Sequence, residues 1–328
     1  MRAIVQDAYG TADAMRFDAA AERPVPGDDD VLVRVRAAGV DAGVWHLMTG
    51  TPYPVRLMGY GLRRPKHRVP GMDLAGTVEA VGANVTRLRP GDEVFGIGKG
   101  AYAEYACAPQ AKLALKPPFL SFEQAAALPV SGLTALQALR DRGGLTVGQK
   151  VLVIGASGGV GSYAVQLAKA YGAEVTGVCG TAKADLVRSL GADHVIDYTR
   201  ADIEGGTAGG VVRYDLILDI AGGRPVARLR RALAPRGTLV LVGNETGGRW
   251  TGGLGRLLWA ALLSPFVRQR LRPMAAAERY EDLVVLGEFV GAGRLTPALD
   301  RTYPLSEAPE AVRSLAEHRV RGKAVITV

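Results

Sequence analysis

The sequence predicts an α/β protein with two domains, one rich in β-strands and one built on a parallel sheet. Residues 1 to 122 contain short apolar runs separated by turn residues, a pattern typical of β-structure. From Lys150 onward, strand-like runs alternate with helix-like runs, which predicts parallel strands joined by crossover helices. A chain of 328 residues also exceeds the size at which a single hydrophobic core keeps growing.

The order of these runs divides the chain into three segments. A helix capped by Ser121 marks the end of the β-rich segment, so we expect the first domain to cover residues 1 to 122. The parallel-sheet domain is expected at 123 to 273. Residues 274 to 328 return to short strands and one helix, and end in the strand-like RGKAVITV. We assign this last segment to the first domain.

Composition indicates an ordered, globular protein. Hydrophobic residues make up 48% of the chain and charged residues 22%, values typical of a protein that buries a core. The formal net charge of +8 is scattered over many arginine-containing segments and does not form one basic run. We therefore expect a small-molecule substrate and no nucleic-acid partner.

Cysteine usage and the apolar runs indicate a cytoplasmic protein without a membrane anchor. Cys107 and Cys179 are far apart and belong to no CxxC pair, which argues against disulfides and a structural zinc lobe. The first ten residues read as a strand and a turn, without the layout of a signal peptide. The longest apolar stretch, 254–267, is shorter than the roughly twenty residues that span a bilayer.

The first strand of the parallel-sheet domain runs directly into a glycine-rich turn. The segment from Lys150 to Gly161 reads KVLVIGASGGVG and leads into a helix that begins near Gly159. Gly155 permits the sharp turn, Gly158 lets the backbone approach a pyrophosphate, and Gly161 allows the helix to pack closely on the sheet. This context predicts the dinucleotide-binding half of a Rossmann domain. The predicted contacts are Gly155, Ser157, Gly158, Gly159, Val160 and Gly161.

The end of the second strand favours NADPH over NADH. The run EVTGVC ends at Cys179, where NAD-binding proteins carry an acidic residue for the ribose hydroxyls. Here the chain continues with Gly180, Thr181, Ala182 and Lys183. The ammonium of Lys183 and the hydroxyl of Thr181 suit a ribose 2′-phosphate. The alternative is that Lys183 is only a solvated residue at the start of a helix.

Motifs throughout the chain resemble the medium-chain dehydrogenase/reductase superfamily. The segments that show this resemblance are GASGGVGSYAVQLAKAYGAEVTG, LGADHVIDY and PGMDLAGTVEAVGANVTRLRPGDEVFG. The resemblance implies a GroES-like β-rich catalytic domain and a Rossmann, doubly wound parallel-sheet cofactor domain. It also implies that Tyr198 lies against the adenine and Thr134 near the nicotinamide. Val242, Gly243 and Asn244 would follow the reactive end of the cofactor, and Lys323 would approach it.

The zinc ligands of that superfamily's alcohol dehydrogenases are missing. Asp41 stands where those enzymes carry a cysteine, and Met72 where they carry a histidine. Without a Lewis acid, polarising an alkoxide becomes harder. The chain thus resembles the zinc-independent quinone oxidoreductase and enoyl reductase branch, which implies hydride transfer to a quinone or to the C=C bond of an α,β-unsaturated carbonyl compound.

Three residues are candidates for acid/base work. Asp41 is a general base or proton relay, or a structural carboxylate that holds a turn. His46 is a proton relay, or a packing residue beside Trp45. Tyr53 resembles the tyrosine that enoyl reductases place beside the nicotinamide and is the leading hydrogen-bond donor to a developing enolate; its alternative is packing in a proline-containing loop. Tyr60 is the second choice.

Two other functions remain open, as does the role of one segment. The chain could be a zinc-free NADP-dependent alcohol or ketone dehydrogenase, or an NADPH-binding regulator or RNA binder with little catalysis. The segment 253–273 combines apolar residues with arginines, which also fits an amphipathic helix at a membrane surface. We prefer a buried position for it, closing over the substrate or packing against a second subunit, and the resemblance favours a homodimer.

Overall fold

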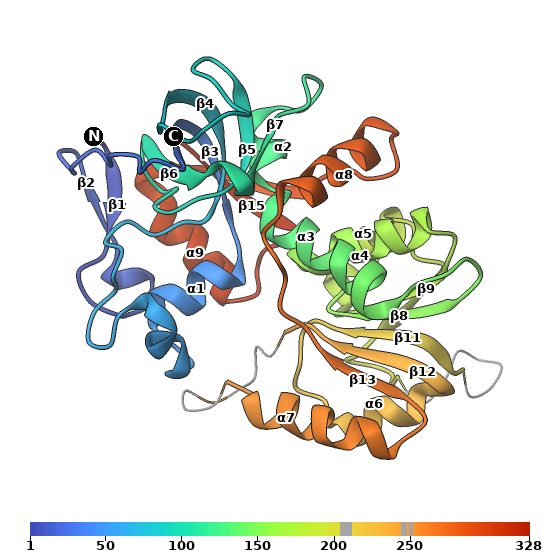
Figure 1. Ribbon diagram of the computed structural model, residues 1–328. Helices are drawn as coiled ribbons and strands as arrows, with labels where there is room; N and C mark the ends of the chain where they lie inside the picture. Colours follow the sequence, from blue (N-terminus) through green and yellow to red (C-terminus); the bar gives the residue numbers. More distant parts are fainter. Residues whose placement is uncertain (204–211, 244–247, 249–251) are drawn as a thin grey trace. The chain divides into compact units, whose positions relative to one another are not determined.

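The computed structural model describes all residues except 204–211, 244–247 and 249–251, and its contacts divide the chain into two compact units (Figure 1). Unit 1 consists of Met1–Leu133, Ala277–Gly293 and Pro297–Val328. Unit 2 consists of Thr134–Ala276 and Arg294–Thr296. Both ends of the chain therefore belong to unit 1.

Unit 2 contains a sheet of parallel strands, as the alternating pattern predicts. The order of the strands described is β10-β9-β8-β11-β12-β13. Their bounds are β8 (Lys150–Ile154), β9 (Glu174–Cys179), β10 (His194–Asp197), β11 (Tyr214–Asp219), β12 (Leu233–Leu241) and β13 (Arg270–Pro273). The helices α4 (Gly159–Ala170) and α5 (Ala184–Ser189) cover one face, and α6 (Val226–Ala232) and α7 (Leu254–Leu263) cover the other (Figure 1). This is a Rossmann-like layout, with β8 near the middle.

Unit 1 is organised around the long strand β3 (Asp30–Val40), which pairs antiparallel with three neighbours. The path through its main sheet is β14-β15-β3-β4-β5-β7, and β6 also pairs with β3. The other strands are β1 (Ala3–Val5), β2 (Arg16–Asp18), β4 (Asp73–Val81), β5 (Glu93–Ile97), β6 (Tyr105–Pro109), β7 (Leu113–Leu115), β14 (Leu299–Pro304) and β15 (Lys323–Thr327). The helices are α1 (Ala42–Thr49), α2 (Phe122–Ala126), α8 (Tyr280–Gly291) and α9 (Ala308–Ala316).

The boundary between the units lies later in the chain than the expected residue 122. The helix α2 packs on the sheet of unit 1 so closely that a Cβ at Gly39 would lie 2.5 Å from the carbonyl oxygen of Ala126. The backbone N–H of Val130 donates to Asp73 in the same unit, at 3.0 Å. These contacts place α2 and the first residues of α3 (Pro129–Gln137) in unit 1. The return to unit 1 occurs at Ala277, three residues after the predicted one.

The helix α7 is packed on only one of its sides within the described chain. Its inner side is packed: Ala260 is buried, and Leu257 and Leu263 contact the core of unit 2. Its outer side carries Leu258, Trp259 and Leu262, which are 63%, 60% and 67% exposed. Phe266, just after the helix, is 85% exposed. The single chain therefore buries one side of α7, and packing of the other side against a second subunit stays a prediction.

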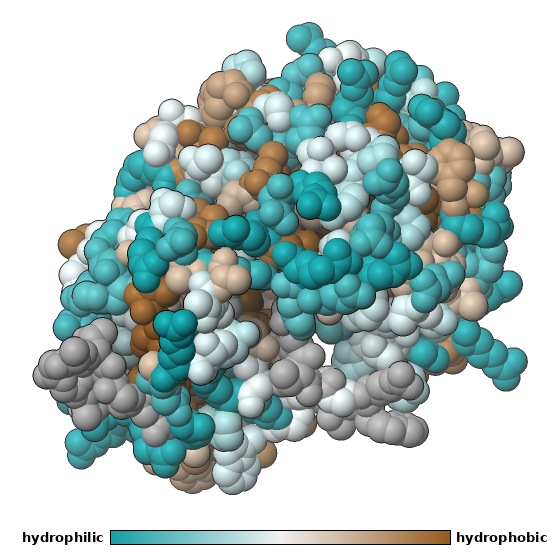
Figure 2. Space-filling model, turned by 180° about the vertical axis from the view of Figure 1, so that it is seen from behind, coloured by the Kyte–Doolittle hydropathy of each residue, from teal (hydrophilic) through white to brown (hydrophobic). Residues whose placement is uncertain are grey.

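The sequence predicts no membrane anchor, and two features of the structure relate to this prediction: the hydropathy of the surface and the length of the helices. On the face shown in Figure 2, hydrophilic residues predominate and apolar residues occur in small separate groups. Within the described ranges, no helix has the length and apolar character needed to cross a bilayer.

Candidate active site

The glycine-rich turn after β8 has the geometry that its sequence predicts. Gly155 adopts a φ of +88°, which favours glycine over any L-residue with a side chain. A Cβ at Gly161 would overlap the carbonyl oxygen of Gly155 and lie 2.7 Å from the Cα of Ala156. The first turn of α4 therefore packs directly against the end of β8, and only glycine fits at Gly161.

Gly158 differs from Gly161 in what surrounds it. It is the N-cap of α4, and the atom nearest to a Cβ placed there is the carbonyl oxygen of Gly155, at 3.6 Å. This is an ordinary contact, so the protein leaves space in front of Gly158. Because the N–H groups of a first helical turn lack partners within the helix, the space suits an anionic pyrophosphate. Ser157, Gly159 and Val160 belong to the same turn, so the described residues fit a dinucleotide cofactor.

At the end of β9, a carboxylate lies beside the residues predicted to select the cofactor. The hydroxyl of Thr181 donates to Asp197 Oδ2 and lies 3.2 Å from the hydroxyl of Thr199. Hydrogen bonds from Thr181 and Thr199 and the charge of Arg200 lower the pKa of Asp197. Sequence reasoning missed Asp197, although it ends β10 and parallel neighbours end at the same edge of a sheet.

The structure brings most of the predicted cofactor residues to one edge of unit 2. The exposed ring of Tyr198 lies next to Gly180, whose Cβ would be 3.4 Å from the phenol oxygen. Val242 and Gly243 follow β12, and both of their N–H groups donate to the carbonyl oxygen of Asp219, at 3.0 and 3.3 Å. Lys183 begins the turn into α5, and Thr134 lies in α3 at the start of unit 2. Asn244 lies outside the described residues.

Lys323 is placed differently from the other predicted cofactor residues, because it belongs to unit 1. Its side chain is buried, and Nζ lies 3.4 Å from Asp73 Oδ2 and 3.3 Å from Ser131 Oγ. Burial and the charge of Asp41 raise the pKa of Asp73 to about 8, and Lys323 opposes this rise. Burial raises the pKa of Tyr102, and the nearby carboxylates of Asp41 and Asp73 raise it further. This cluster of Asp41, Asp73, Tyr102, Ser131 and Lys323 is a polar group enclosed in a mainly apolar unit.

Asp41 is at the N-terminus of α1. Its Oδ1 accepts from the backbone N–H of Gly43 at 2.8 Å, so one oxygen caps the helix. Its Oδ2 is buried, with no hydrogen-bond partner among the residues the structure describes. One carboxylate oxygen thus has the structural role weighed from the sequence, and the other remains available for chemistry.

His46 and Tyr53 lie near each other in the chain but make separate contacts. The Nδ1 of His46 is 3.0 Å from the carbonyl oxygen of Thr51. The guanidinium of Arg56 lies over the ring of Tyr53, 4.8 Å from its centroid. Both side chains are half-buried. These contacts orient both residues and leave their catalytic roles as predictions.

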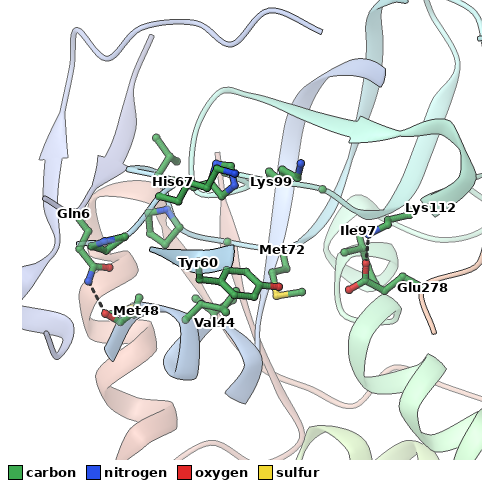
Figure 3. A pocket seen from close by; sticks show the side chains of 18 of the residues that line it. Gln6, Val44, Met48, Tyr60, His67, Met72, Ile97, Lys99, Lys112 and Glu278 are labelled. Atoms are coloured by element: carbon green, nitrogen blue, oxygen red, sulfur yellow. Dashed lines mark hydrogen bonds and ion pairs between the residues drawn. The ribbon is translucent and has the colours of Figure 1, made fainter. Parts of the chain in front are cut away.

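Unit 1 contains a cavity of about 130 Å³ beside α1 and the loop that follows it (Figure 3). Apolar side chains of Val44, Met48, Met72 and Ile97 form much of its wall. Tyr60, the second-choice donor, lines the cavity, whereas Tyr53 does not belong to the lining. The cavity also has a charged side that composition alone did not reveal, formed by Lys66, His67 and Lys99.

The described part of the chain offers no cluster of three or more His, Cys, Asp or Glu side chains arranged to hold a metal ion. At the positions where zinc dehydrogenases carry ligands, Asp41 caps a helix and Met72 lines the cavity.

Comparison with protein families finds two matches. Residues 27–118 match the alcohol dehydrogenase GroES-like domain, and residues 190–326 match a family described as zinc-binding dehydrogenase. The first match falls within unit 1. The second begins in unit 2 and continues into the C-terminal segment of unit 1.

Similar proteins extend over the full length of the chain. A chloroplast envelope quinone oxidoreductase homolog from Arabidopsis thaliana is 30% identical over 335 residues, covering 99% of this chain and 98% of that protein. The mitochondrial NAD(P)H oxidoreductase RTN4IP1 of Mus musculus is 33% identical over 361 residues, covering 100% and 89%. The solved structure of Escherichia coli quinone oxidoreductase complexed with NADPH has a TM-score of 0.84 at 26% identity and covers both chains completely, 100% of each.

Proposed function

Since the chain belongs to the medium-chain dehydrogenase/reductase superfamily and is an NAD(P)H-dependent oxidoreductase of the quinone oxidoreductase family, we propose that it uses NADPH to reduce a quinone or the C=C bond of an α,β-unsaturated carbonyl compound. Bound NADPH supplies the hydride in such a reaction. The protein's own residues must hold the cofactor, bind the acceptor and provide a proton or a hydrogen bond to the oxygen that gains charge.

The observation that carries this proposal is the cavity in unit 1, which pairs apolar walls with a phenol. Val44, Met72 and Ile97 suit a planar apolar acceptor, and Tyr60 can donate a hydrogen bond to a carbonyl oxygen. Neither Met72 nor the helix cap Asp41 belongs to a cluster of metal ligands in the described residues. Reduction of a conjugated acceptor needs a hydrogen-bond donor and a proton, and does not require a Lewis acid. We therefore propose zinc-independent chemistry.

The preference for NADPH rests on the residues after β9. The positions 180 to 183 contain no acidic residue, and Lys183 supplies a cation close to the predicted ribose site. Asp197 opposes this preference, because its carboxylate lies within hydrogen-bond distance of Thr181. We propose that Lys183 outweighs it, since the hydroxyls of Thr181 and Thr199 already bind the Asp197 carboxylate.

Product analysis distinguishes the proposed reaction from its closest alternative. The purified protein is incubated with NADPH and an enone that can be reduced at either group, and the products are separated by gas chromatography. We expect the saturated ketone. An allylic alcohol would instead support a zinc-free alcohol or ketone dehydrogenase. Salt-sensitive RNA binding without NADPH consumption over a panel of quinones and enones would support the regulatory alternative.

Substitution of the two tyrosines tests the donor. Tyr53→Phe and Tyr60→Phe each remove only a hydroxyl, so each serves as the control for the other. We propose that loss of the true donor lowers kcat by about 10- to 100-fold and leaves the Kd for NADPH unchanged. If neither substitution lowers kcat, neither tyrosine is the donor, and Asp41 and His46 become the groups to test.

We also propose a homodimer and a cytoplasmic location. The exposed apolar side of α7 suits a second subunit. Relatives of the chain include proteins named as chloroplastic and mitochondrial, so cell fractionation is the direct test of location.

A further inference from the structure

Three cationic or titratable groups lie along one side of the cavity in unit 1. They are Lys66 and His67, from the loop after Tyr60, and Lys99, two residues after the end of β5. Figure 3 shows His67 and Lys99 on the same side of the cavity, with Tyr60 and Val44 across from them. The cavity thus has a basic side and an apolar side.

Backbone hydrogen bonds fix the positions of these groups. The N–H of Lys66 donates to the carbonyl oxygen of Tyr60 at 2.8 Å, which closes the loop between them. On the other segment, the N–H of Gly98 donates to Met72 at 2.9 Å and the N–H of Gly100 to Gly71 at 3.1 Å. The side chains of Lys66, His67 and Lys99 are exposed, but the backbone at Lys66 and around Lys99 is held by these hydrogen bonds.

The positive charge of this side is not neutralised within the described part of the chain. Neither Lys66 nor Lys99 has a carboxylate at ion-pair distance there, whereas Lys112, farther along the cavity, pairs with Glu278. Partial desolvation and the charges of Lys99 and Lys66 lower the pKa of His67. Beyond the effect of desolvation, the two lysines thus place a positive potential at His67.

An apolar wall facing unpaired cations fits an amphiphilic anion. We propose that the physiological acceptor has an apolar body, bound against Val44 and Met72, and an anionic end group, a carboxylate or a phosphate, held by Lys66, His67 and Lys99. This inference rests on the proposed function and narrows it to anionic quinones or enones. Neutral acceptors would then be poorer substrates than anionic ones of the same size.

Binding of simple amphiphiles tests the inference without turnover. Isothermal titration calorimetry is carried out on the full chain with octanoate, octyl phosphate and 1-octanol, which share one apolar chain. We expect at least one anion to bind at least about 10-fold more tightly than the alcohol. Its affinity should fall as the salt concentration rises, while that of 1-octanol does not. The anion that binds more tightly identifies the end group.

Charge-removing variants assign the effect to this side of the cavity. Lys66→Gln with Lys99→Gln should weaken binding of the preferred anion about 10-fold and leave 1-octanol within about twofold. The matched control, Lys150→Gln with Arg236→Gln, removes the same charge from exposed positions of unit 2 and should change neither affinity. Retained binding of 1-octanol shows that the double variant is folded.

The outcomes separate this inference from the proposed function. Equal affinity for anions and alcohol, or an equal loss in both double variants, would overturn the anionic subsite even if the protein reduces quinones. Conversely, selective anion binding that depends on Lys66 and Lys99 would support the subsite even if no quinone or enone in the panel were reduced.

Discussion

The Nζ of Lys323 lies 3.4 Å from Oδ2 of Asp73, in the interior of unit 1 and across 250 positions of sequence. The other oxygen of Asp73 accepts from the backbone N–H of Val130, at 3.0 Å. Burial and the neighbouring carboxylate of Asp41 outweigh these favourable contacts and raise the pKa of Asp73 to about 8. Asp73 therefore titrates near neutral pH in the folded protein, unlike an ordinary aspartate.

This raised pKa predicts a pH dependence of stability. Between pH 3.8, the ordinary pKa of an aspartate, and about pH 8, the carboxyl group of Asp73 is protonated in the folded protein and ionised in the unfolded chain. The free energy of unfolding therefore falls as pH rises through this window, by at most about 1.4 kcal/mol for each pH unit. Asp73→Asn removes the titration, so wild type should lose stability relative to this variant between about pH 5 and about pH 7.5 in urea denaturation.

Exposed Asp28 provides the control, because Asp28→Asn makes the same chemical change at the surface. The wild type and the control should show the same slope of stability against pH. A slope that survives in Asp73→Asn would mean that another group causes it, and the protonated state of Asp73 would be refuted.

The two glycines of the turn after β8 predict different consequences of the same substitution. Gly161→Ala places a Cβ on the Gly155 carbonyl oxygen and close to Ala156, so it should cost about 3 kcal/mol of unfolding free energy. Gly158→Ala makes only an ordinary 3.6 Å contact and should cost less than about 1 kcal/mol. Its methyl group would nevertheless fill the space predicted for the pyrophosphate. NADPH should bind to it at least about 10-fold more weakly, as measured by fluorescence titration.

Stability by thermal denaturation and NADPH affinity by titration are measured for both variants and compared with wild type. If Gly158→Ala binds NADPH as tightly as wild type, the pyrophosphate does not lie in front of Gly158. If Gly161→Ala is as stable as wild type, the helix does not approach the strand as closely as the structure indicates.

The Rossmann-like half could be predicted from the sequence because its signals are local. The strand β8, the turn at Gly155 and the helix α4 follow each other within about twenty residues, and each glycine meets a constraint set by its near neighbours. The same holds for the Ser121 cap of α2, whose side chain accepts from the N–H of Gln124. Short-range geometry of this kind depends little on the rest of the fold.

The remaining features depend on contacts between distant residues. The boundary at Leu133 follows from the packing of Ala126 against Gly39, which no run of letters near residue 122 reveals. Likewise, Asp197 meets Thr181 only because β10 pairs with β9. The basic side of the cavity joins two segments more than thirty residues apart, and each lysine alone resembles an ordinary surface residue.

The exposed side of α7 predicts self-association. Leu258, Trp259 and Leu262 form an apolar strip on one side of the helix, and a strip of this kind is unfavourable in water unless a partner covers it. We expect the chain to be a dimer in size-exclusion chromatography with light scattering. Leu258→Glu with Leu262→Glu should give monomers with an unchanged circular dichroism spectrum.

A matched control for the dimer uses another exposed apolar residue. Val25, in unit 1, is 87% exposed, so Val25→Glu adds a negative charge at an exposed apolar position outside α7 and should leave the dimer intact. A wild-type monomer, or a dimer that tolerates both glutamates on α7, would show that this helix is not the interface.

Lys183 and Asp197 should have opposite effects on the choice of cofactor. Lys183→Gln removes the cation predicted to meet the 2′-phosphate, so NADPH should bind about 10-fold more weakly while NADH changes by less than about twofold. Asp197→Asn removes a like charge beside Thr181 and should tighten NADPH binding by about 3- to 10-fold, because the carboxylate repels the phosphate. Both Kd values are measured for both cofactors in each variant. If Lys183→Gln weakens NADH and NADPH equally, Lys183 contacts a part that the two cofactors share, and the selection of NADPH must be sought elsewhere.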